Sequence, residues 1–424
     1  MSKKIFSIFI IIILVLLGLC GTVFAKDTYT ATSTINGVTV NWSYELNDSN
    51  QIENLKCINP TDLIGNVIIP STLDGKTVVT LGNSAFKSAT KITEITIPNS
   101  VKEIGLEAFS GCTSLSNINL GNVERICDQS FKNCTSLTSI KLPKTLNKGA
   151  SGAPFSGCEN LKNIELEEGM TVVPDYVCAS TPITEITIPN SVKEIGLWAF
   201  SGCTSLSNIN LGNVERICDQ SFKNCTSLTS IKLPKTLNKG ASGAPFSGCE
   251  NLKNIELEEG MTVVPDYVCA STPITEITIP NSVKKIGMWT FKNCTFLKKI
   301  TILDNVTDMG GYNSSNTDLV FENHNDSLTV YCYKDSMAAN YAIKYNIKYV
   351  YLTKPAIDNN EENKEDKKQN ITKPAIDAKQ EIPTIATGKL PQAGSSSVII
   401  ISIIAVMVIL IINYKRYNSY KDIK

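Results

Sequence analysis

The sequence has few of the residues on which most enzyme active sites depend. Histidine occurs once among 424 residues, at His324, and tryptophan occurs three times. A single histidine excludes sites that need several imidazoles as general bases or zinc ligands. The glycine-containing stretch 147–158 lacks the Gly-Lys-Ser/Thr ending of a phosphate-binding loop. We therefore expect no catalytic residue, no cofactor and no metal, and we predict that the protein is not an enzyme.

An excess of positive charge is also absent. The whole chain has a formal net charge of zero, and residues 27–352 contain 26 Lys and Arg against 32 Asp and Glu, a net charge of −6. Nucleic acids and anionic lipid surfaces are attracted by a basic field, which this charge balance does not provide. The composition therefore argues against nucleic acid as a partner.

The N-terminus has the pattern of a secretory signal peptide. Lys3 and Lys4 precede an almost wholly apolar run at residues 5–19, and small residues before Ala25 suit a signal peptidase. We predict that residues 1–25 are removed by cleavage between Ala25 and Lys26. The alternative is a lipoprotein acylated at Cys20, but Leu19 stands where that signal requires a small residue.

The C-terminus carries an apolar segment followed by basic residues. Residues 395–412 form an 18-residue stretch, which is just long enough to span a bilayer. The tail, residues 413–424, contains four Lys and Arg against one acid. Positive charge after an apolar span holds that end in the cytoplasm, so the region between the termini is expected outside the cell.

Internal repetition dominates the rest of the chain. Residues 92–182 recur as 183–273 and differ only at Glu107 against Trp198, and a third, partial copy starts at Ile274. Each block contains four units of 22 to 24 residues. Every unit opens with a short strand pattern, Ile-x-Ile or Ile-x-Leu, and continues with an aromatic and a cysteine. One unit cannot bury its apolar face, but a stack of units buries a continuous column.

The sequence predicts that the chain is divided into several segments, including a cap at each end of the repeat region. Asn36-Gly37 indicates a hairpin in the N-terminal cap, in which Trp42 is expected to close the column. The C-terminal cap is expected to contain a strand, a helix around 338–345 and a final strand. A polar segment that lacks core-forming residues is interpreted as a disordered spacer. The predicted parts are a signal peptide (1–25), an N-terminal cap (26–66), a repeat solenoid (67–299), a last turn and C-terminal cap (300–352), a spacer (353–389), a short motif (390–394), a transmembrane span (395–412) and a basic tail (413–424).

Thirteen cysteines remain after removal of the signal peptide, and nine of them recur once per unit. These are Cys112, Cys134, Cys158, Cys178, Cys203, Cys225, Cys249, Cys269 and Cys294. Ala89 occupies the same position in the first unit, which favours a small buried residue there, so we expect free thiols. Disulfides between neighbouring turns and, less favourably, a metal site are the alternatives.

The units resemble the BspA-like leucine-rich repeat family of bacterial surface proteins. The resemblance rests on "ITIPNSVKEIGLEAFSGCTSL" and its relatives, from about residue 67 to 351. It implies a repeat solenoid of the leucine-rich type, mostly β, with a parallel strand ladder on one face and turns and short helices on the other. It also implies an extracellular protein without catalytic machinery, since members with a known role are largely adhesins.

The motif 390–394 resembles the cell-wall sorting signal of Gram-positive surface proteins. It consists of Leu390, Pro391, Gln392, Ala393 and Gly394, with Ala where the family usually has Thr. The resemblance implies that sortase cuts between Ala393 and Gly394 and joins the chain to peptidoglycan in the cell wall. The alternative is a protein anchored only by its membrane span.

The predicted function is adhesion or binding of a host matrix protein, a glycan or another cell. A self-assembling surface coat is the alternative, and a sensor or scaffold is a weaker third reading. Strand alternation predicts an outward row on the ladder, repeated in both blocks. Its members are Thr96, Asn119, Lys141, Glu165, Thr187, Asn210, Lys232 and Glu256, followed by Thr278 and Thr301 after the second block. A second outward row precedes it and contains Glu94, Asn117, Ser139, Asn163, Glu185, Asn208, Ser230 and Asn254. Trp198 and Trp289 are either exposed anchors or packed on neighbouring turns.

Overall fold

A computed structural model describes residues 26–147, 152–240, 243–310 and 319–354. The predicted signal peptide, most of the spacer, the sorting motif, the transmembrane span and the basic tail lie outside these residues. The boundaries given above for the parts of the chain remain predictions. Within the described ranges, no helix is long and apolar enough to cross a bilayer.

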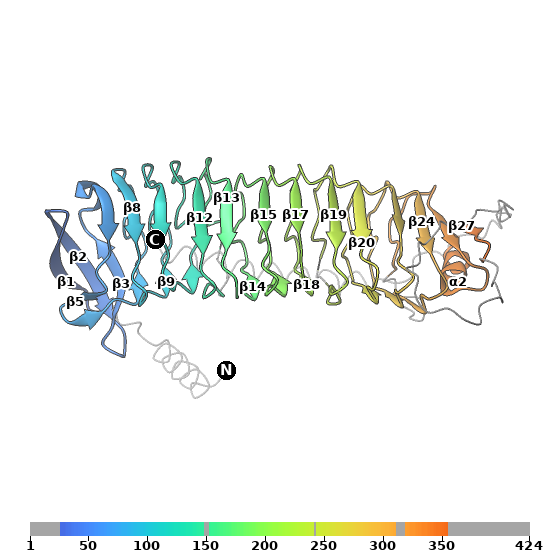
Figure 1. Ribbon diagram of the computed structural model, residues 1–424, viewed down its shortest axis with the longest axis horizontal. Coiled ribbons are helices and arrows are strands. Elements are labelled where there is room, and N and C mark those ends of the chain that lie inside the picture. The colour runs from blue at the N-terminus through green and yellow to red at the C-terminus, as the bar shows by residue number, and fades with distance from the viewer. Residues whose placement is uncertain (1–25, 148–151, 241–242, 311–318, 355–424) are drawn as a thin grey trace, which may run out of the picture. The chain divides into compact units, whose positions relative to one another are not determined.

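The repeat region is a parallel β-solenoid, as predicted, and one strand of each turn joins the main ladder (Figure 1). Inward isoleucines stack from turn to turn; Ile118 lies opposite Ile95, and Ile164 lies opposite Ile140. All four are buried, because β-branched residues suit a strand with one covered face. The main ladder consists of β4 (Gly65–Ile68), β8 (Ile92–Thr96), β10 (Asn117–Asn119), β12 (Ser139–Leu142), β13 (Asn163–Leu166), β15 (Glu185–Thr187), β17 (Asn208–Asn210), β19 (Ser230–Leu233), β20 (Asn254–Leu257), β22 (Glu276–Thr278), β24 (Lys299–Ile302), β26 (Thr329–Cys332) and β27 (Lys348–Tyr351).

Hydrogen bonding along the main ladder is interrupted. The hydrogen-bonded sheets are β4-β8-β10, β12-β13, β15-β17, β19-β20 and β22-β24-β26-β27. Gaps therefore recur after every second strand in the middle of the ladder. Each gap leaves two parallel strands side by side without backbone hydrogen bonds between them.

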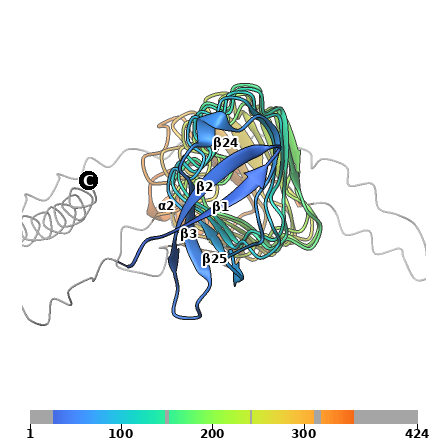
Figure 2. The ribbon, with the colours of Figure 1, turned by 90° about the vertical axis from the view of Figure 1, so that its left-hand side faces the viewer.

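A second ladder of two-residue strands runs along another side of the solenoid, where the successive turns superimpose in the end-on view (Figure 2). Its strands are β7 (Thr80–Leu81), β9 (Glu103–Ile104), β11 (Arg125–Ile126), β14 (Val172–Val173), β16 (Glu194–Ile195), β18 (Arg216–Ile217), β21 (Val263–Val264), β23 (Lys285–Ile286) and β25 (Asp308–Met309). A small hairpin, β5 (Thr72–Leu73) with β6 (Lys76–Thr77), lies beside the first turn.

The short helices expected on the side away from the main ladder are not found in the described residues, where tight turns replace them. The helices present are η1 (Pro60–Asp62) and α2 (Met337–Lys344), which belong to the caps. The physical reason is a pair of left-handed residues in each turn, such as Glu107 at φ 53° and Gly111 at φ 75°. A right-handed helix cannot continue through positive φ, so the backbone turns instead.

The core is a column of stacked rings. Consecutive phenylalanines lie 5.2 to 5.3 Å apart, centroid to centroid, in two runs. The runs are Phe86, Phe109, Phe131 and Phe155, and then Phe200, Phe222 and Phe246. Such offset stacking adds to the burial energy of each ring. Within each run, every turn therefore contributes one ring to the stack.

The position of the aromatic in every fourth unit differs from that in the other units. Tyr176 is the aromatic of its unit in the sequence, but the place in the column is taken by Cys178, whose N–H donates to Ala199 O directly before Phe200. Cys269 takes the equivalent place before Phe291. Both side chains are buried, while Tyr176 is half-buried outside the column. The column is consequently interrupted at Cys178 and at Cys269.

Both ends of the column are closed by aromatic residues of the caps. Trp42 lies edge-on against Phe86 at 5.9 Å, and its ring nitrogen donates to Ser33 Oγ. At the other end Tyr341 of α2 lies edge-on against Phe321, also at 5.9 Å. The expected role of Trp42 in closing the column is confirmed, and so is the strand–helix–strand order of the C-terminal cap, β26-α2-β27.

The N-terminal cap joins the start of the second ladder in one sheet of six strands, and it also contacts the first strand of the main ladder. Its strands β1 (Tyr29–Ile35) and β2 (Val38–Leu46) form the predicted hairpin, with positive φ at Asn36 and Gly37, and β3 (Ile52–Cys57) follows. The Asn36 side-chain amide donates to Ile64 O and Asn66 O beside β4. An unpaired strand edge invites association, so this contact protects the first strand of the ladder.

Deletion of residues 183–273 is expected to leave a folded, shorter solenoid. Ile274 would then follow Pro182 in the same sequence context in which Ile183 follows it now, so each turn keeps its stacking partner. Circular dichroism per residue should be unchanged and thermal unfolding should remain cooperative. A chain that aggregates or loses its β-sheet signal after this deletion would contradict the stacking argument.

Candidate functional site

The predicted outward row lies where strand alternation places it, along the solvent side of the main ladder. In the second block Asn210 lies opposite Thr187 and Glu256 lies opposite Lys232. The first block repeats this arrangement with Asn119 opposite Thr96 and Glu165 opposite Lys141. All of these residues are exposed except Thr96, which is half-buried. The row is therefore available to a partner, and its role in binding remains a prediction.

Cross-strand ion pairs recur within this row. Lys141 Nζ lies 2.7 Å from Glu165 Oε1, and Lys232 Nζ lies 2.8 Å from Glu256 Oε1. These hydrogen bonds raise the pKa of both lysines. More than half of each side chain remains exposed, so the pairs contribute little to stability and stay accessible to a ligand.

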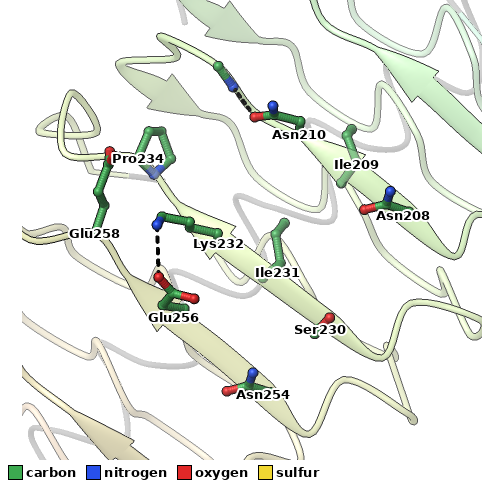
Figure 3. A pocket seen from close by; sticks show the side chains of 11 residues that line it. Asn208, Ile209, Asn210, Ser230, Ile231, Lys232, Pro234, Asn254, Glu256 and Glu258 are labelled. Atoms are coloured by element: carbon green, nitrogen blue, oxygen red, sulfur yellow. Dashed lines mark hydrogen bonds and ion pairs between the residues drawn. The ribbon is translucent and has the colours of Figure 1, made fainter.

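Shallow grooves lie over the gaps in the ladder (Figure 3). One groove, of about 460 Å³, covers the gap between β17 and β19, and another, of about 420 Å³, covers the gap between β20 and β22. The sequence gives no signal for these grooves, because the strands on both sides of a gap carry the same repeat pattern as hydrogen-bonded strands.

The two tryptophans are packed on neighbouring turns, and part of each ring stays exposed. Trp198 stacks on Tyr176 of the preceding turn at 5.8 Å, and Lys223 Nζ of the next turn lies 4.7 Å from its ring centroid. Trp289 lies 4.9 Å from Tyr267 and donates from Nε1 to Glu322 Oε2 at 2.7 Å. Both are half-buried, so neither presents a free ring face. In each case the tyrosine precedes the tryptophan by 22 residues, a regularity present in the sequence.

This packing explains the single difference between the two blocks. The turn below Trp198 supplies Tyr176, whereas the turn below Glu107 supplies Ser84 at the corresponding left-handed position. A tryptophan at 107 would have no ring to stack on. Glu107 instead pairs with Lys87, with 2.7 Å between Oε2 and Nζ.

The cysteines fill two different kinds of position. Seven of the nine predicted ladder cysteines lie in a column beside the rings, where each Sγ donates to the carbonyl of the aromatic-column residue in the preceding turn. The distances include 3.2 Å for Cys112 to Phe86 O and 3.0 Å for Cys158 to Phe131 O. Cys178 and Cys269 lie in the ring column, and Thr181 and Thr272 take over the thiol positions of those turns. The position therefore requires a small residue and, in most turns, a hydrogen-bond donor.

All thirteen described cysteines are free, and eleven of them are buried. Burial raises the pKa of the Cys112 thiol to about 12 and that of the Cys203 thiol to about 11. The pKa values of the half-buried Cys127 and Cys218 are also raised, to about 11 and about 12. The first cause is burial, and the second is the neighbouring carboxylate, Glu103 for Cys127 and Glu194 for Cys218. A protonated thiol is a poor nucleophile and metal ligand.

The second ladder carries ion pairs between adjacent strands. The strand that carries the acid in the second block corresponds to the strand that carries the base in the third, partial copy. Arg216 lies 3.9 Å from Glu194 across β16 and β18, and in the third, partial copy Lys285 lies 3.1 Å from Asp308 across β23 and β25. Opposite charges on adjacent strands stabilise a sheet whichever strand carries which sign. The exchange indicates that this face maintains pairing between turns, as the Lys–Glu pairs of the main ladder also do.

Several predicted site residues cannot be placed. Ala25 and the sorting residues Leu390, Pro391, Gln392, Ala393 and Gly394 lie outside the described residues. Lys26, which follows the predicted cleavage point, forms an ion pair with Glu53 of β3. Within the described part of the chain, no group of three or more His, Cys, Asp or Glu side chains is placed to hold a metal ion.

These features define a leucine-rich repeat solenoid with an exposed polar ladder and capped ends. The family model described as "BspA type Leucine rich repeat region (6 copies)" matches residues 51–177, 79–207, 152–244 and 215–340. The matched residues span more than half of the chain, which belongs to this family. The resemblance inferred from the sequence is thereby confirmed, whereas the sorting signal remains a prediction. A search of curated proteins found no significant match.

Solved structures of other leucine-rich repeat proteins are similar in part. A leucine-rich repeat protein from Bacteroides ovatus is 27% identical, with a TM-score of 0.42, over 74% of this chain and 71% of that chain. The pneumococcal vaccine antigen PcpA is 20% identical, with a TM-score of 0.42, over 76% and 99%. A leucine rich cell surface protein from Faecalibacterium prausnitzii is 21% identical, with a TM-score of 0.35, over 73% and 96%.

Thiol labelling is expected to depend steeply on pH and on unfolding. Because the thiolate is the reactive form, labelling of native protein at Cys127 and Cys218 should accelerate about tenfold per pH unit from pH 8 toward their raised pKa values. Denaturation without reductant should release all thirteen thiols, measured by mass spectrometry after alkylation. Recovery of fewer than about four free thiols would favour disulfides over the free thiols described here.

The two blocks differ only at Glu107 and Trp198, and replacing each of these residues by the other tests the stacking of Trp198. Trp198→Glu should lower the free energy of unfolding by about 1 to 2 kcal/mol, because the aromatic pair and the cation–π contact are lost. Glu107→Trp, the matched control, should bring no gain, since Ser84 offers no ring. Denaturant unfolding measures both, and equal effects of the two substitutions would contradict this explanation.

Proposed function

We propose that this chain is a cell-surface binding protein that uses the main ladder to hold other surfaces. The observation that carries the proposal is the duplicated, exposed polar row. Thr187, Asn210, Lys232 and Glu256 repeat Thr96, Asn119, Lys141 and Glu165 on the same face. The blocks start 91 residues, or four strands, apart, so equivalent groups are displayed about 19 Å apart at the usual strand spacing. Membership of a surface-protein family and the predicted signal peptide support an extracellular location.

Duplicated patches favour a ligand that presents its binding groups repeatedly. When two patches engage one ligand, the second contact is intramolecular, and avidity rises without new kinds of contact. Host matrix proteins, glycans and the surfaces of other cells all present repeated groups. A catalytic role is not proposed, because the rows contain no nucleophile with a neighbouring base.

Covalent attachment to the cell wall belongs to the same proposal. The motif Leu390-Pro391-Gln392-Ala393-Gly394 directly before the apolar span supports sorting by sortase and linkage to peptidoglycan, after the signal peptide has directed export. The protein would then stand outside a Gram-positive wall. The alternative, in which the chain assembles into a coat, draws support from β27, which is hydrogen-bonded on one side only among the described strands.

The anchor is tested by the end of the mature chain. Material released from the wall by muramidase should contain a peptide that ends at Ala393 and carries cross-bridge atoms, detected by mass spectrometry. Leu390→Ala should move the protein to the membrane fraction or the medium. Recovery of the intact chain only from detergent-extracted membrane would exclude sorting.

The binding role is tested with two matched deletions. After a screen of matrix proteins and glycans identifies a ligand, loss of residues 183–273 should weaken binding to the multivalent form about tenfold or more and leave binding to a monovalent fragment nearly unchanged. Deletion of 92–182 is the control, because the resulting chain differs from the first only by Trp in place of Glu.

Two outcomes would count against binding through the duplicated row. Equal affinity for both ligand forms before and after deletion would show that the second block is only a spacer. Ordered assembly of purified protein without any ligand, seen by sedimentation and electron microscopy, would favour the coat.

A further inference from the structure

Two adjoining grooves cross the main ladder from the second block into the third, partial copy, and together they are called the trough. They lie over the β17–β19 and β20–β22 gaps and share Asn254 and Glu256 among their lining residues. The trough reaches from β17 to Lys299 of β24, and its direction is across the strands. Five strands lie along it, a length of about 19 Å at the usual strand spacing. A ligand that fits must therefore be narrow and linear and must follow the solenoid axis.

The trough has a polar wall and an apolar floor that is already packed. Ile209, Ile231 and Ile255 contribute to the lining, but their side chains are buried in the core. An extended peptide would find no apolar pocket for an anchoring side chain. Strand addition is also disfavoured, because it requires a free sheet edge rather than the surface of a ladder.

Three neighbouring side chains in the β17–β20 half of the trough are unpartnered within the described residues. Asn208, Ser230 and Asn254 stand in one row on β17, β19 and β20, and all three are exposed (Figure 3). None of them makes a side-chain hydrogen bond within the described residues. Amides and hydroxyls both donate and accept, which suits the hydroxyl groups of sugars. Asn208 and Asn254 lie two strands apart, at about 10 Å.

The charges of the trough disfavour an anionic ligand. Its lining includes two lysines, Lys232 and Lys299, and the ammonium of Lys232 is held by Glu256 at 2.8 Å. The carboxylates in the lining outnumber the lysines; they are Glu256, Glu258, Glu259 and Glu276. A sulfated or uronic-acid polymer would meet net repulsion there.

We propose that the trough binds a neutral, linear, β-1,4-linked glycan that lies along the solenoid axis. Each sugar in such a chain is turned over relative to the previous one, so equivalent hydroxyls face the same side at every second sugar. That recurrence is comparable to the two-strand interval between Asn208 and Asn254. The inference rests on the proposed function, since it names the ligand class for the same face.

The first block supplies a second copy of the contact groups. Asn117, Ser139 and Asn163 occupy the equivalent positions, and Lys141 pairs with Glu165 as Lys232 does with Glu256. One difference is that Asn117 donates to Glu94 Oε1 at 3.0 Å. A long glycan could therefore engage both blocks in succession.

Soluble oligosaccharides of defined length test the inference on the full chain. Cello- and chito-oligosaccharides of two, four and six sugars are titrated by calorimetry, with hyaluronan oligosaccharides as the anionic comparison. Affinity should rise about tenfold or more from two to four sugars, because the second amide is then reached. It should rise little from four to six, and the anionic series should bind at least tenfold more weakly.

Alanine at the amides of both blocks supplies the residue-level test. The variant N117A/N163A/N208A/N254A should lose about tenfold or more in affinity for the four-sugar probe. The matched control is Q129A/Q220A, which removes two amides away from the trough and should bind as the parent does. Circular dichroism of both variants verifies that the solenoid is intact.

The inference is overturned if affinity is independent of length, if the anionic series binds best, or if the four-alanine variant binds as tightly as its control. If no β-1,4-linked glycan binds while a matrix protein still binds through the ladder, the glycan inference fails and the proposed function stands. If neither binds in any form, both fail.

Discussion

The structure depends on keeping each turn in vertical register with the next, and one repeated contact achieves this. The thiol of one turn donates to the carbonyl of the aromatic residue in the preceding turn, next to the stacked rings. The same carbonyl also accepts a backbone N–H within its own turn, so the thiol adds a second hydrogen bond, one that links two turns, and a stacked ring has a fixed spacing. The thiol hydrogen bond therefore fixes the orientation of one turn relative to the preceding turn, and the stacked ring fixes the distance between the two turns. The exposed rows of the main ladder are regular because this internal column is regular.

Much of the fold could be predicted because the sequence repeats its physical requirements. The inward isoleucines, the hairpin at Asn36-Gly37 and the closing role of Trp42 follow from alternation, turn preference and the need to cover the end of a column. The helices inferred from the family resemblance were wrong, since positive φ at ordinary residues such as Glu107 and Trp198 has no clear sequence signal. The place of Cys178 was missed because its unit shifts the ring position by two residues.

The residues that form the candidate surface could be predicted from the sequence, but the grooves in that surface could not. Alternation identifies which side chains point outward, and those residues are found on the solvent side of the ladder. The trough lies where hydrogen bonds are missing between particular strands, and nothing in the pattern of side chains distinguishes those strands. The status of Trp198 depended on its neighbours in space, Tyr176 and Lys223, which are about one turn away in sequence. A comparison of Glu107 with Trp198 becomes informative only when Ser84 and Tyr176 are seen beneath them.

The interruptions of the ring column at Cys178 and Cys269 have a mechanical consequence. A solenoid is held together by a series of interfaces between neighbouring turns, and its cooperativity is limited by the weakest of them. The small side chains of Cys178 and Cys269 remove the ring-on-ring contacts at the interfaces on both sides of their turns, four in all, and divide the column into segments. Under load along its axis, such a chain would yield segment by segment instead of all at once. A surface protein with this property would lengthen in steps and absorb force while its remaining segments keep their binding faces intact.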